Sequence, residues 1–438
     1  FPPEDDWILY APYSDKSLIR NALAYRLSND MGWYASRTRF CEVVLNGDYR
    51  GVYVLMEKIK RDKNRVDISK LNPTENTGDD IPGGYIIKID KMDGAETAGW
   101  ESAYAPVPRW WQRIFYQYHY PDQDDISRKQ KDYIQSFIYH YESLMKGPDY
   151  ADLQKGYSRY INIDSFVDNF IIIEVSKNID GYRLSTFFHK DRDSKDGRLT
   201  MGPVWDYNLA FGNADYYNAD VIHGWQVDFQ EKEDFWQIPF WWQKLMADPN
   251  FVDKINSRWH RLRQDILDTS RIISIIDSLA AHIDEAQKRN FKRWDILGTY
   301  VWPNPYIGGS YYAEIRYLKY WLQSRILWMD MNLQKMQAVD RDENFPAQFA
   351  LKQNHPNPFN SRTQIDYVVW KSGNVCLVIY DLLGQHIKTL VNSQQQAGIF
   401  QVRWDGMDKN GSSVSAGVYF CRMEAGEFVK AIKLVVTK

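Results

Sequence analysis

Two short segments of the chain pair an aspartate with an amide side chain. Asp180 follows Asn178 by two residues, and Asp206 precedes Asn208 by two. Each aspartate ends an apolar run of sequence. Carboxylate and amide oxygens are the ligands that Mg²⁺ takes, and a separate aspartate can orient an attacking hydroxyl. Phosphoryl transfer, which needs a base and divalent metal ligands, is therefore the leading chemistry for this pair.

Both segments also have a purely structural explanation. Asn178 and Asp180 would simply satisfy backbone groups where a helix ends. Residues 205–208 would form a turn around a buried tryptophan. The structural explanation is weaker for this second segment, because polar side chains directly after an apolar strand are costly unless their oxygens find partners.

The first third of the chain is predicted to be mostly sheet. Two β-rich runs flank Asn46-Gly47, and both of these residues tolerate the positive φ angles of a tight hairpin turn. Lys88 lies inside another predicted strand, which follows a glycine pair. The predicted elements are a helix over 17–27 and strands over 39–45, 51–57 and 83–90.

The middle of the chain is predicted to be helical. Apolar residues recur at helical spacing over 133–145 and over 166–175, and the second of these helices leads directly to Asn178. Later helices are predicted at 251–267, 271–288 and 312–335. A sheet-rich front followed by a helical body is an α+β layout, which a two-lobed kinase-like domain shares with many other enzymes.

The tail changes character after a polar stretch near residue 345. Short alternating runs separated by turn clusters, Asn392-Ser393 among them, predict a small all-β sandwich of the Ig-like kind. The predicted strands are 364–369, 375–380, 400–404, 417–423 and 428–436. The predicted domains are therefore 1–337 and 351–438, joined by a linker over 338–350.

Length and composition narrow the classes of function. The 438 residues suffice for two or three domains, and a net charge of −3 argues against nucleic acid as a partner. No run approaches the roughly 20 apolar residues of a transmembrane segment. The chain starts at Phe1 without a signal peptide, which suggests a fragment from which a targeting segment could have been lost. Cys376 and Cys421 could form a disulfide in an exported protein or remain buried thiols.

The body resembles the CotH family of spore-coat-type protein kinases, from Phe1 to about residue 330. The stretches that carry the resemblance are Asp15-Lys-Ser-Leu-Ile-Arg20-Asn21, Leu45-Asn46-Gly47 with Gly51-Val-Tyr53-Val-Leu-Met-Glu57, Gly83-Gly84-Tyr-Ile-Ile-Lys88, Asn178-Ile-Asp180-Gly181 and Trp205-Asp206. The resemblance implies an atypical protein-kinase-like fold, with ATP and Mg²⁺ as cofactors. Relatives usually carry further strands before the position of Phe1, so the kinase-like domain is expected to be N-terminally incomplete.

The same resemblance implies roles for the two aspartates and their amides. Asp180 would be the catalytic base, which accepts the proton of a substrate hydroxyl. Asp206 would bind Mg²⁺ in the place of the aspartate of a kinase Asp-Phe-Gly motif. Asn178 and Asn208 would be supplementary oxygen ligands, although many relatives show aspartate at the position of Asn208.

Two further residues would contact the nucleotide. Lys88 lies in a strand that parallels the Val-Ala-Ile-Lys strand of kinases, and it would neutralise the phosphates. A lysine on the solvent face of an amphipathic strand is the alternative. Glu57, at the end of the hairpin strand, is expected to pair with Lys88 or orient it.

The tail resembles the FlgD-like immunoglobulin type of sorting domain, which directs proteins through the type IX secretion system. The matching stretches are Asn357-Pro358-Phe359-Asn360, Tyr380-Asp381-Leu-Leu-Gly384-Gln385, Trp404-Asp405-Gly406, Ala416-Gly417-Val418-Tyr419-Phe420 and the closing Lys-Leu-Val-Val-Thr-Lys. The resemblance implies contact with the type IX machinery and a secreted or cell-surface location. An ordinary Ig-like module without a sorting role is the alternative.

Three functions remain open at this point. The first is an exported kinase that transfers the γ-phosphoryl group of ATP to Ser or Thr hydroxyls of an extracellular or surface protein. The second is a catalytically weak or inactive surface binding protein on a kinase-like scaffold. The third is a carbohydrate-active enzyme. Several tryptophans could stack on sugars or adenine, or could fill the core, namely Trp110, Trp111, Trp236, Trp241 and Trp242.

Overall fold

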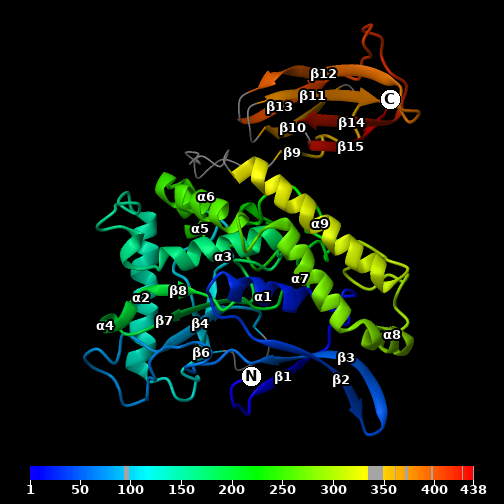
Figure 1. The fold of residues 1–438 in the computed structure, drawn as a ribbon. Helices are drawn as coiled ribbons and strands as arrows, with labels where there is room; N and C mark the ends of the chain where they lie inside the picture. Colours follow the sequence, from blue (N-terminus) through cyan, green and yellow to red (C-terminus); the bar gives the residue numbers. More distant parts are fainter. Residues whose placement is uncertain are drawn as a thin grey trace. The chain divides into compact units, whose positions relative to one another are not determined.

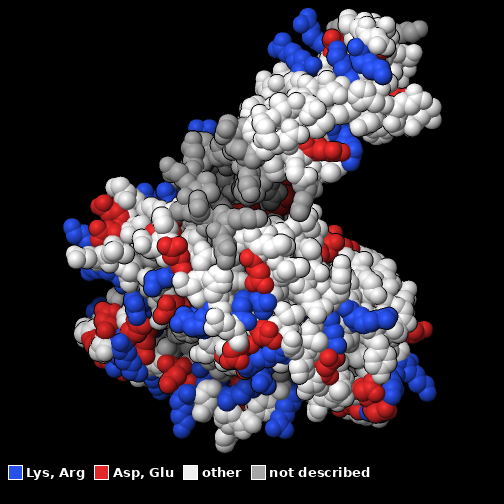
Figure 2. Space-filling view, turned by 45° about the horizontal axis from the view of Figure 1, so that its top comes forward, with Lys and Arg blue, Asp and Glu red and all other residues white. Residues whose placement is uncertain are grey.

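The computed structural model divides the chain into two compact units, Phe1–Val339 and Asp340–Lys438 (Figure 1). The residues described are 1–92, 98–333, 349–360, 362–369, 373–395, 398–426 and 428–437. The linker predicted over 338–350 lies almost entirely outside them. No helix in these ranges is both long enough and apolar enough to cross a membrane. Acidic and basic side chains are interspersed over the visible face of the first unit (Figure 2), in keeping with the net charge of −3 of the whole chain.

The first unit begins with a three-stranded antiparallel sheet in the order β1-β3-β2. Its strands are β1 (Trp7–Tyr10), β2 (Thr38–Leu45) and β3 (Asp48–Glu57). The turn between β2 and β3 confirms the predicted hairpin, since Asn46 and Gly47 have φ angles of 51° and 80°. Helix α1 (Arg20–Asp30) starts three residues later than predicted. Leu18 has a φ of 64°, which a right-handed helix cannot contain.

A second, five-stranded sheet carries the segments that lead to the two aspartates. Its order is β5-β6-β4-β7-β8, and each neighbouring pair is antiparallel. The strands are β4 (Tyr85–Ile89), β5 (Gly99–Glu101), β6 (Phe115–Tyr120), β7 (Thr186–Lys190) and β8 (Leu199–Met201). The central strand, β4, is buried except at Lys88. Asp180 lies shortly before β7, and Asp206 lies shortly after β8.

Helices make up the rest of the first unit and share one hydrophobic core with the second sheet. They are α2 (Arg128–Lys146), α3 (Ile163–Ser176), α4 (Asp193–Asp196), α5 (Trp241–Ala247), α6 (Pro249–Arg263), α7 (Thr269–His282), α8 (Asp284–Arg293) and α9 (Tyr311–Asn332), with 3₁₀ turns at Tyr157–Arg159 and Gln226–Asp228. Figure 1 shows α3 in the interior, between α1 and the helices α5 and α6. The helix predicted over 271–288 is two helices, because the chain breaks at Ile283. Trp241 and Trp242 lie in the core.

The second unit is all-β, as predicted. Two sheets, in the orders β13-β10-β9 and β12-β11-β14-β15, enclose a core around Leu377 and Trp404. The strands are β9 (Ala350–Leu351), β10 (Thr363–Val369), β11 (Gly373–Tyr380), β12 (His386–Gln395), β13 (Gly398–Trp404), β14 (Gly417–Ala425) and β15 (Phe428–Val436).

One strand of the second unit differs from the prediction, and the structure decides between the two alternatives left for the cysteines. The turn predicted at Asn392-Ser393 is wrong, because both residues lie inside β12. This strand is at the edge of its sheet and largely exposed, so its polar residues hide the strand pattern. Cys376 and Cys421 are free thiols on neighbouring strands. They are not opposite each other, since Cys376 pairs with Glu424 in the register.

Candidate functional site

The second sheet and helix α3 bring Asp180 and Asp206 into one electrostatic neighbourhood. Burial, together with the nearby carboxylates of Asp180 and Asp90, raises the pKa of the Asp206 carboxyl to about 6, and Lys91 opposes this rise. Two loops from separate stretches of sequence therefore lie close enough for their carboxylates to influence each other. Asp90, which follows strand β4, is a third acidic residue in the same neighbourhood.

Among the described residues, Arg183 is the one cation that forms an ion pair with Asp180. Burial raises its pKa, Arg183 and Lys91 oppose that rise, and Asp90 and Asp234 add to it. The Nη2 atom of Arg183 lies 3.4 Å from Oδ1 of Asp180. The same guanidinium donates to Oδ2 of Asp234 at 3.0 Å, so its charge is shared between two carboxylates. The Asp180 carboxylate thus keeps its capacity to accept a proton.

Asp90 and Lys91 belong to this site, although neither was predicted from the sequence. They follow β4 directly, and the side-chain amide of Gln117, on the neighbouring strand β6, donates to both of their carbonyl oxygens, at 2.7 and 3.2 Å. The signal that could have revealed Asp90 is its place at the end of an almost completely buried strand, where a carboxylate needs a partner.

Lys88 is connected to the site by its ion pair with Asp90. Its Nζ is 3.1 Å from Oδ2 of Asp90, and it lies 6.0 Å from the ring centroid of Phe187. Its side chain is partly exposed, and Lys88 is the one position of β4 that is not buried.

The expected pair between Glu57 and Lys88 is wrong. Glu57 is buried at the end of β3, in the other sheet, and its Oε1 accepts from Nη2 of Arg37 at 2.6 Å. Its Oε2 accepts from Nε of Arg37 at 2.9 Å and from the hydroxyl of Tyr34 at 3.2 Å. The Nε atom of Arg65 lies 3.6 Å from Oε1 of Glu57. Arginine, which binds a carboxylate through two parallel hydrogen bonds, fills the place that the lysine was expected to take.

The two asparagines are close to the aspartates, but tyrosines engage their side chains. Asn178 is buried, accepts a hydrogen bond from the backbone amide of Asp180 at 3.3 Å, and bonds the hydroxyl of Tyr207. Asn208 bonds the hydroxyl of Tyr10. Both amides therefore already serve to order the loops, whether or not they also bind a metal.

The backbone at Asp206 is held in an unusual conformation. Its φ is 57°, a left-handed value that costs free energy in a residue other than glycine and that is enriched at functional sites. The Asp206 amide donates to the hydroxyl of Tyr25 at 3.1 Å, and the next amide donates to Oδ1 of Asn21 at 2.6 Å. Both acceptors lie on α1. Trp205 stacks on Tyr25, with 14° between the rings.

A buried polar network fixes the loop that carries Asp180. Lys177 ends α3 with a φ of 43°, and its Nζ donates to the carbonyl oxygens of Asn218, Val221 and His223 at 2.7 to 2.8 Å. One turn earlier, Glu174 pairs with Arg325 at 3.1 Å, and both side chains are fully buried. Helix α9 and the 218–228 segment are thereby joined to the end of α3.

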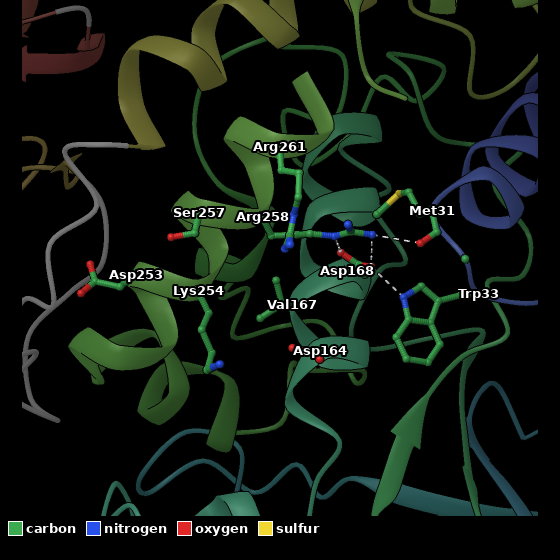
Figure 3. A pocket seen from close by; sticks show the side chains of 11 residues that line it. Met31, Trp33, Asp164, Val167, Asp168, Asp253, Lys254, Ser257, Arg258 and Arg261 are labelled. Atoms are coloured by element: carbon green, nitrogen blue, oxygen red, sulfur yellow. Dashed lines mark hydrogen bonds and ion pairs between the residues drawn. The ribbon is translucent and has the colours of Figure 1, made fainter. Parts of the chain in front are cut away.

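A cavity lies elsewhere in the first unit, near the start of α3. It has a volume of about 600 Å³ and is lined by Met31, Gly32, Trp33, Asp164, Val167, Asp168, Asp253, Lys254, Ser257, Arg258 and Arg261. Figure 3 shows Arg258 crossing it to reach Asp168 and the carbonyl of Met31, while Trp33 donates to Asp168. The charges of Arg258 and Asp168 are thus paired with each other. Neither Asp180 nor Asp206 lines this cavity.

The donor set around Asp206 suits a hard divalent cation. Within the described ranges, the Asp206 carboxylate accepts no hydrogen bond and forms no ion pair, although it is half-buried beside two other carboxylates. Such a group needs a positive partner or must take up a proton. The only described set of three or more candidate ligand groups within 4.8 Å of one another is Glu4-Asp5-Asp6, so the carboxylates around Asp206 do not already form so compact a cage. Mg²⁺, which usually takes one or two carboxylates, fits this arrangement.

Comparison with known families agrees with this layout. The model of the CotH kinase protein family matches residues 1–329, which is most of the chain. The chain therefore belongs to the CotH kinase family. A second family model, the FlgD Ig-like domain, matches residues 362–427 in the all-β unit. No curated protein matches the chain.

Solved structures show only local likeness. Dimeric latent PorU from Porphyromonas gingivalis is 20% identical, with a TM-score of 0.17, over 23% of this chain and 10% of that one. PorZ, a surface component of the type IX secretion system of the same organism, is 18% identical, with a TM-score of 0.16, over 20% and 12%. The DNA glycosylase AlkC from Pseudomonas fluorescens is 12% identical, with a TM-score of 0.17, over 44% and 54%. The chain spans less than two thirds of each of these proteins, and such scores carry no argument about function.

Proposed function

We propose that the protein is an ATP-dependent kinase that transfers the γ-phosphoryl group to Ser or Thr hydroxyls of an extracellular or surface protein. The observation that supports this most directly is the meeting of Asp180 and Asp206 beside Asp90 and Lys91. Phosphoryl transfer needs little covalent chemistry from the protein. It needs a positioned base, carboxylates that hold a metal, and cations for the phosphates.

The roles follow from the surroundings of each group. Asp180, whose pKa is raised by burial, accepts the proton of the attacking hydroxyl. Lys91, whose charge lowers the pKa of both aspartates, would neutralise the phosphates together with Lys88. Asp206, with Asn178 and Asn208 as supplementary oxygen donors, would hold Mg²⁺. When bound, the ion would neutralise charge on the transferring phosphoryl group.

A surface binding protein on a kinase-like scaffold is the second candidate. It is favoured by three contacts that compete with catalysis: Lys88 is paired with Asp90, Asn178 bonds Tyr207, and Asn208 bonds Tyr10. In this case nucleotide would not bind. A thermal shift with ATP and Mg²⁺ distinguishes the two functions, because only the kinase should be stabilised by them.

Export through the type IX machinery belongs to the same proposal. It is supported by the stretches of the C-terminal unit quoted above and by the match to the FlgD Ig-like domain. Deletion of residues 351–438 in a host that has this secretion system should leave the protein inside the cell. Secretion of the truncated chain at the level of the full chain would contradict a sorting role.

The test of the kinase itself is transfer of labelled γ-phosphate to the protein or to a generic protein acceptor. We expect Mg²⁺-dependent incorporation that Asp180→Asn and Asp206→Asn each abolish. Asp132→Asn, an exposed position on α2, is the matched control and should remain active. No incorporation by the unaltered chain, or equal incorporation by Asp180→Asn, would refute the proposal.

A further inference from the structure

Four aromatic side chains form a partly exposed patch at two loops of the first unit. The patch consists of Tyr216, Tyr217, Tyr300 and Trp302, and we refer to it as the aromatic platform. Trp302 is 65% exposed, Tyr300 50% and Tyr217 40%. Large aromatic side chains are usually buried, and a cluster of exposed ones marks a site of interaction.

The rings of the platform are ordered with respect to one another. Tyr216 and Trp302 are parallel to within 2°, with centroids 6.0 Å apart, and Tyr217 packs edge-on against Tyr216 at 5.3 Å. The two loops are tied together at Asp215. Its amide donates to the carbonyl of Pro303 at 2.9 Å, and its carboxylate accepts from the hydroxyl of Tyr300 at 2.8 Å. The platform is therefore already in place before any ligand binds.

The backbone of the platform is strained. Tyr217 and Asn218 have φ angles of 53° and 57°, two successive left-handed residues that are not glycine. Such conformations persist only where the surroundings impose them, and they cluster at ligand sites. Here Lys177 imposes them in part, since its Nζ donates to the carbonyl oxygen of Asn218 at 2.7 Å.

The platform begins at the candidate catalytic loop. Burial raises the pKa of the Tyr216 phenol, and the Asp180 carboxylate adds to the rise, so the two groups are neighbours. The guanidinium of Arg183, which pairs with Asp180, lies 5.9 Å from the Tyr217 ring centroid and 4.3 Å from that of Phe229. Arg183 therefore connects the Tyr217 side of the platform to Asp180.

We propose that the aromatic platform binds the sugar rings of a neutral carbohydrate chain. The apolar face of a pyranose ring matches the flat, exposed face of Trp302, and the carboxylate of Asp215 at its edge can accept hydrogen bonds from sugar hydroxyls. The carboxylates near Tyr216, namely Asp180 and Asp234, disfavour nucleic acid and other polyanions. This inference concerns binding and does not depend on phosphoryl transfer.

A peptide partner fits the platform less well. Peptides commonly pair with a sheet edge, and neither 215–218 nor 300–303 belongs to a strand. A Lys- or Arg-rich peptide would place its cations over the faces of the aromatic rings. At the Tyr217 ring, Arg183 already makes this contact.

The test measures binding to the full chain without nucleotide, by saturation-transfer NMR and calorimetry. The probes are cellohexaose, chitohexaose and laminarihexaose. At least one of the three should bind, and Trp302→Ala should weaken that binding about tenfold or more. Trp302→Phe, which keeps a flat ring, should retain most of it. Tyr320→Ala, at a position on α9 that is 70% exposed, is the control and should bind as the unaltered chain does.

Three outcomes would overturn the inference. They are absence of binding by all three sugars, binding that Trp302→Ala does not weaken, and Trp302-dependent binding of a Lys-rich peptide when the sugars are silent. Because nucleotide is absent, sugar binding can succeed when phosphate transfer fails, and the reverse also holds. The thermal stability of each variant shows whether a loss of binding reflects unfolding.

Discussion

The hydroxyl of Tyr25, on α1, accepts a hydrogen bond from the backbone amide of Asp206 at 3.1 Å. This contact joins a helix near the start of the chain to a loop about 180 residues later. It lies where the backbone adopts a left-handed conformation and where the side chain has no partner among the described residues. Helix α1 therefore helps to impose the geometry of the candidate metal ligand.

Tyr25→Phe should loosen this loop without unfolding the protein. The Asp206 amide would lose its acceptor, at a cost of roughly 1 kcal/mol in the free energy of unfolding. Mn²⁺ affinity, measured by electron paramagnetic resonance, should fall more than stability does, because Asp206 would no longer be held in place. Tyr320→Phe on α9 is the control. Unchanged metal affinity in Tyr25→Phe would show that α1 has no part in ordering the site.

The pH dependence of stability should report on Asp206. Its pKa in the folded protein is about 6, above the ordinary value of 3.8, so the folded state favours the protonated form. The stabilising contribution is complete below about pH 4 and is lost as pH rises through about 6, by roughly 3 kcal/mol. In EDTA, the stability of Asp206→Asn should not fall as pH rises through about 6. This variant should therefore be more stable than the unaltered chain at pH 7.

Mg²⁺ should reverse that trend in the unaltered chain. The ion binds the ionised carboxylate, so its stabilising effect should appear as pH rises through about 6 and be absent in Asp206→Asn. Thermal unfolding at a series of pH values, with Mg²⁺ and with EDTA, measures both effects. A Mg²⁺ effect of the same size in Asp206→Asn would remove Asp206 from the metal site.

The sequence was a good guide where local pattern decides structure and a poor one where distant packing does. The turn at Asn46-Gly47 and the all-β tail follow from local preferences, and both are confirmed. The partner of Glu57 was predicted wrongly, because local pattern does not tell which sheet a strand joins. Asp90 was missed for the same reason: only the assembled sheet places the end of β4 beside Asp206.

The buried pair of Glu174 and Arg325 should be essential for the stability of the first unit. Arg325→Met would leave the Glu174 carboxylate without its cation in a fully buried place, at a cost of about 3 to 5 kcal/mol. Urea unfolding followed by tryptophan fluorescence measures this change. The double variant Glu174→Gln with Arg325→Met should recover part of the loss, because no uncompensated charge remains. If the double variant is as unstable as Arg325→Met, lost packing rather than charge explains the effect.

Lys91, rather than Lys88, should control the titration of the two aspartates. The Lys91 ammonium lowers the pKa of both carboxyls, whereas Lys88 is paired with Asp90. In Lys91→Met the pKa of Asp206 should rise above about 6, so Mg²⁺ stabilisation should begin at a higher pH than in the unaltered chain. Lys88→Met should move this onset less. The onset is measured from melting temperature against pH, with and without Mg²⁺, and it does not depend on enzymatic activity. If the onset shifts more in Lys88→Met than in Lys91→Met, then Lys88 and not Lys91 controls the titration.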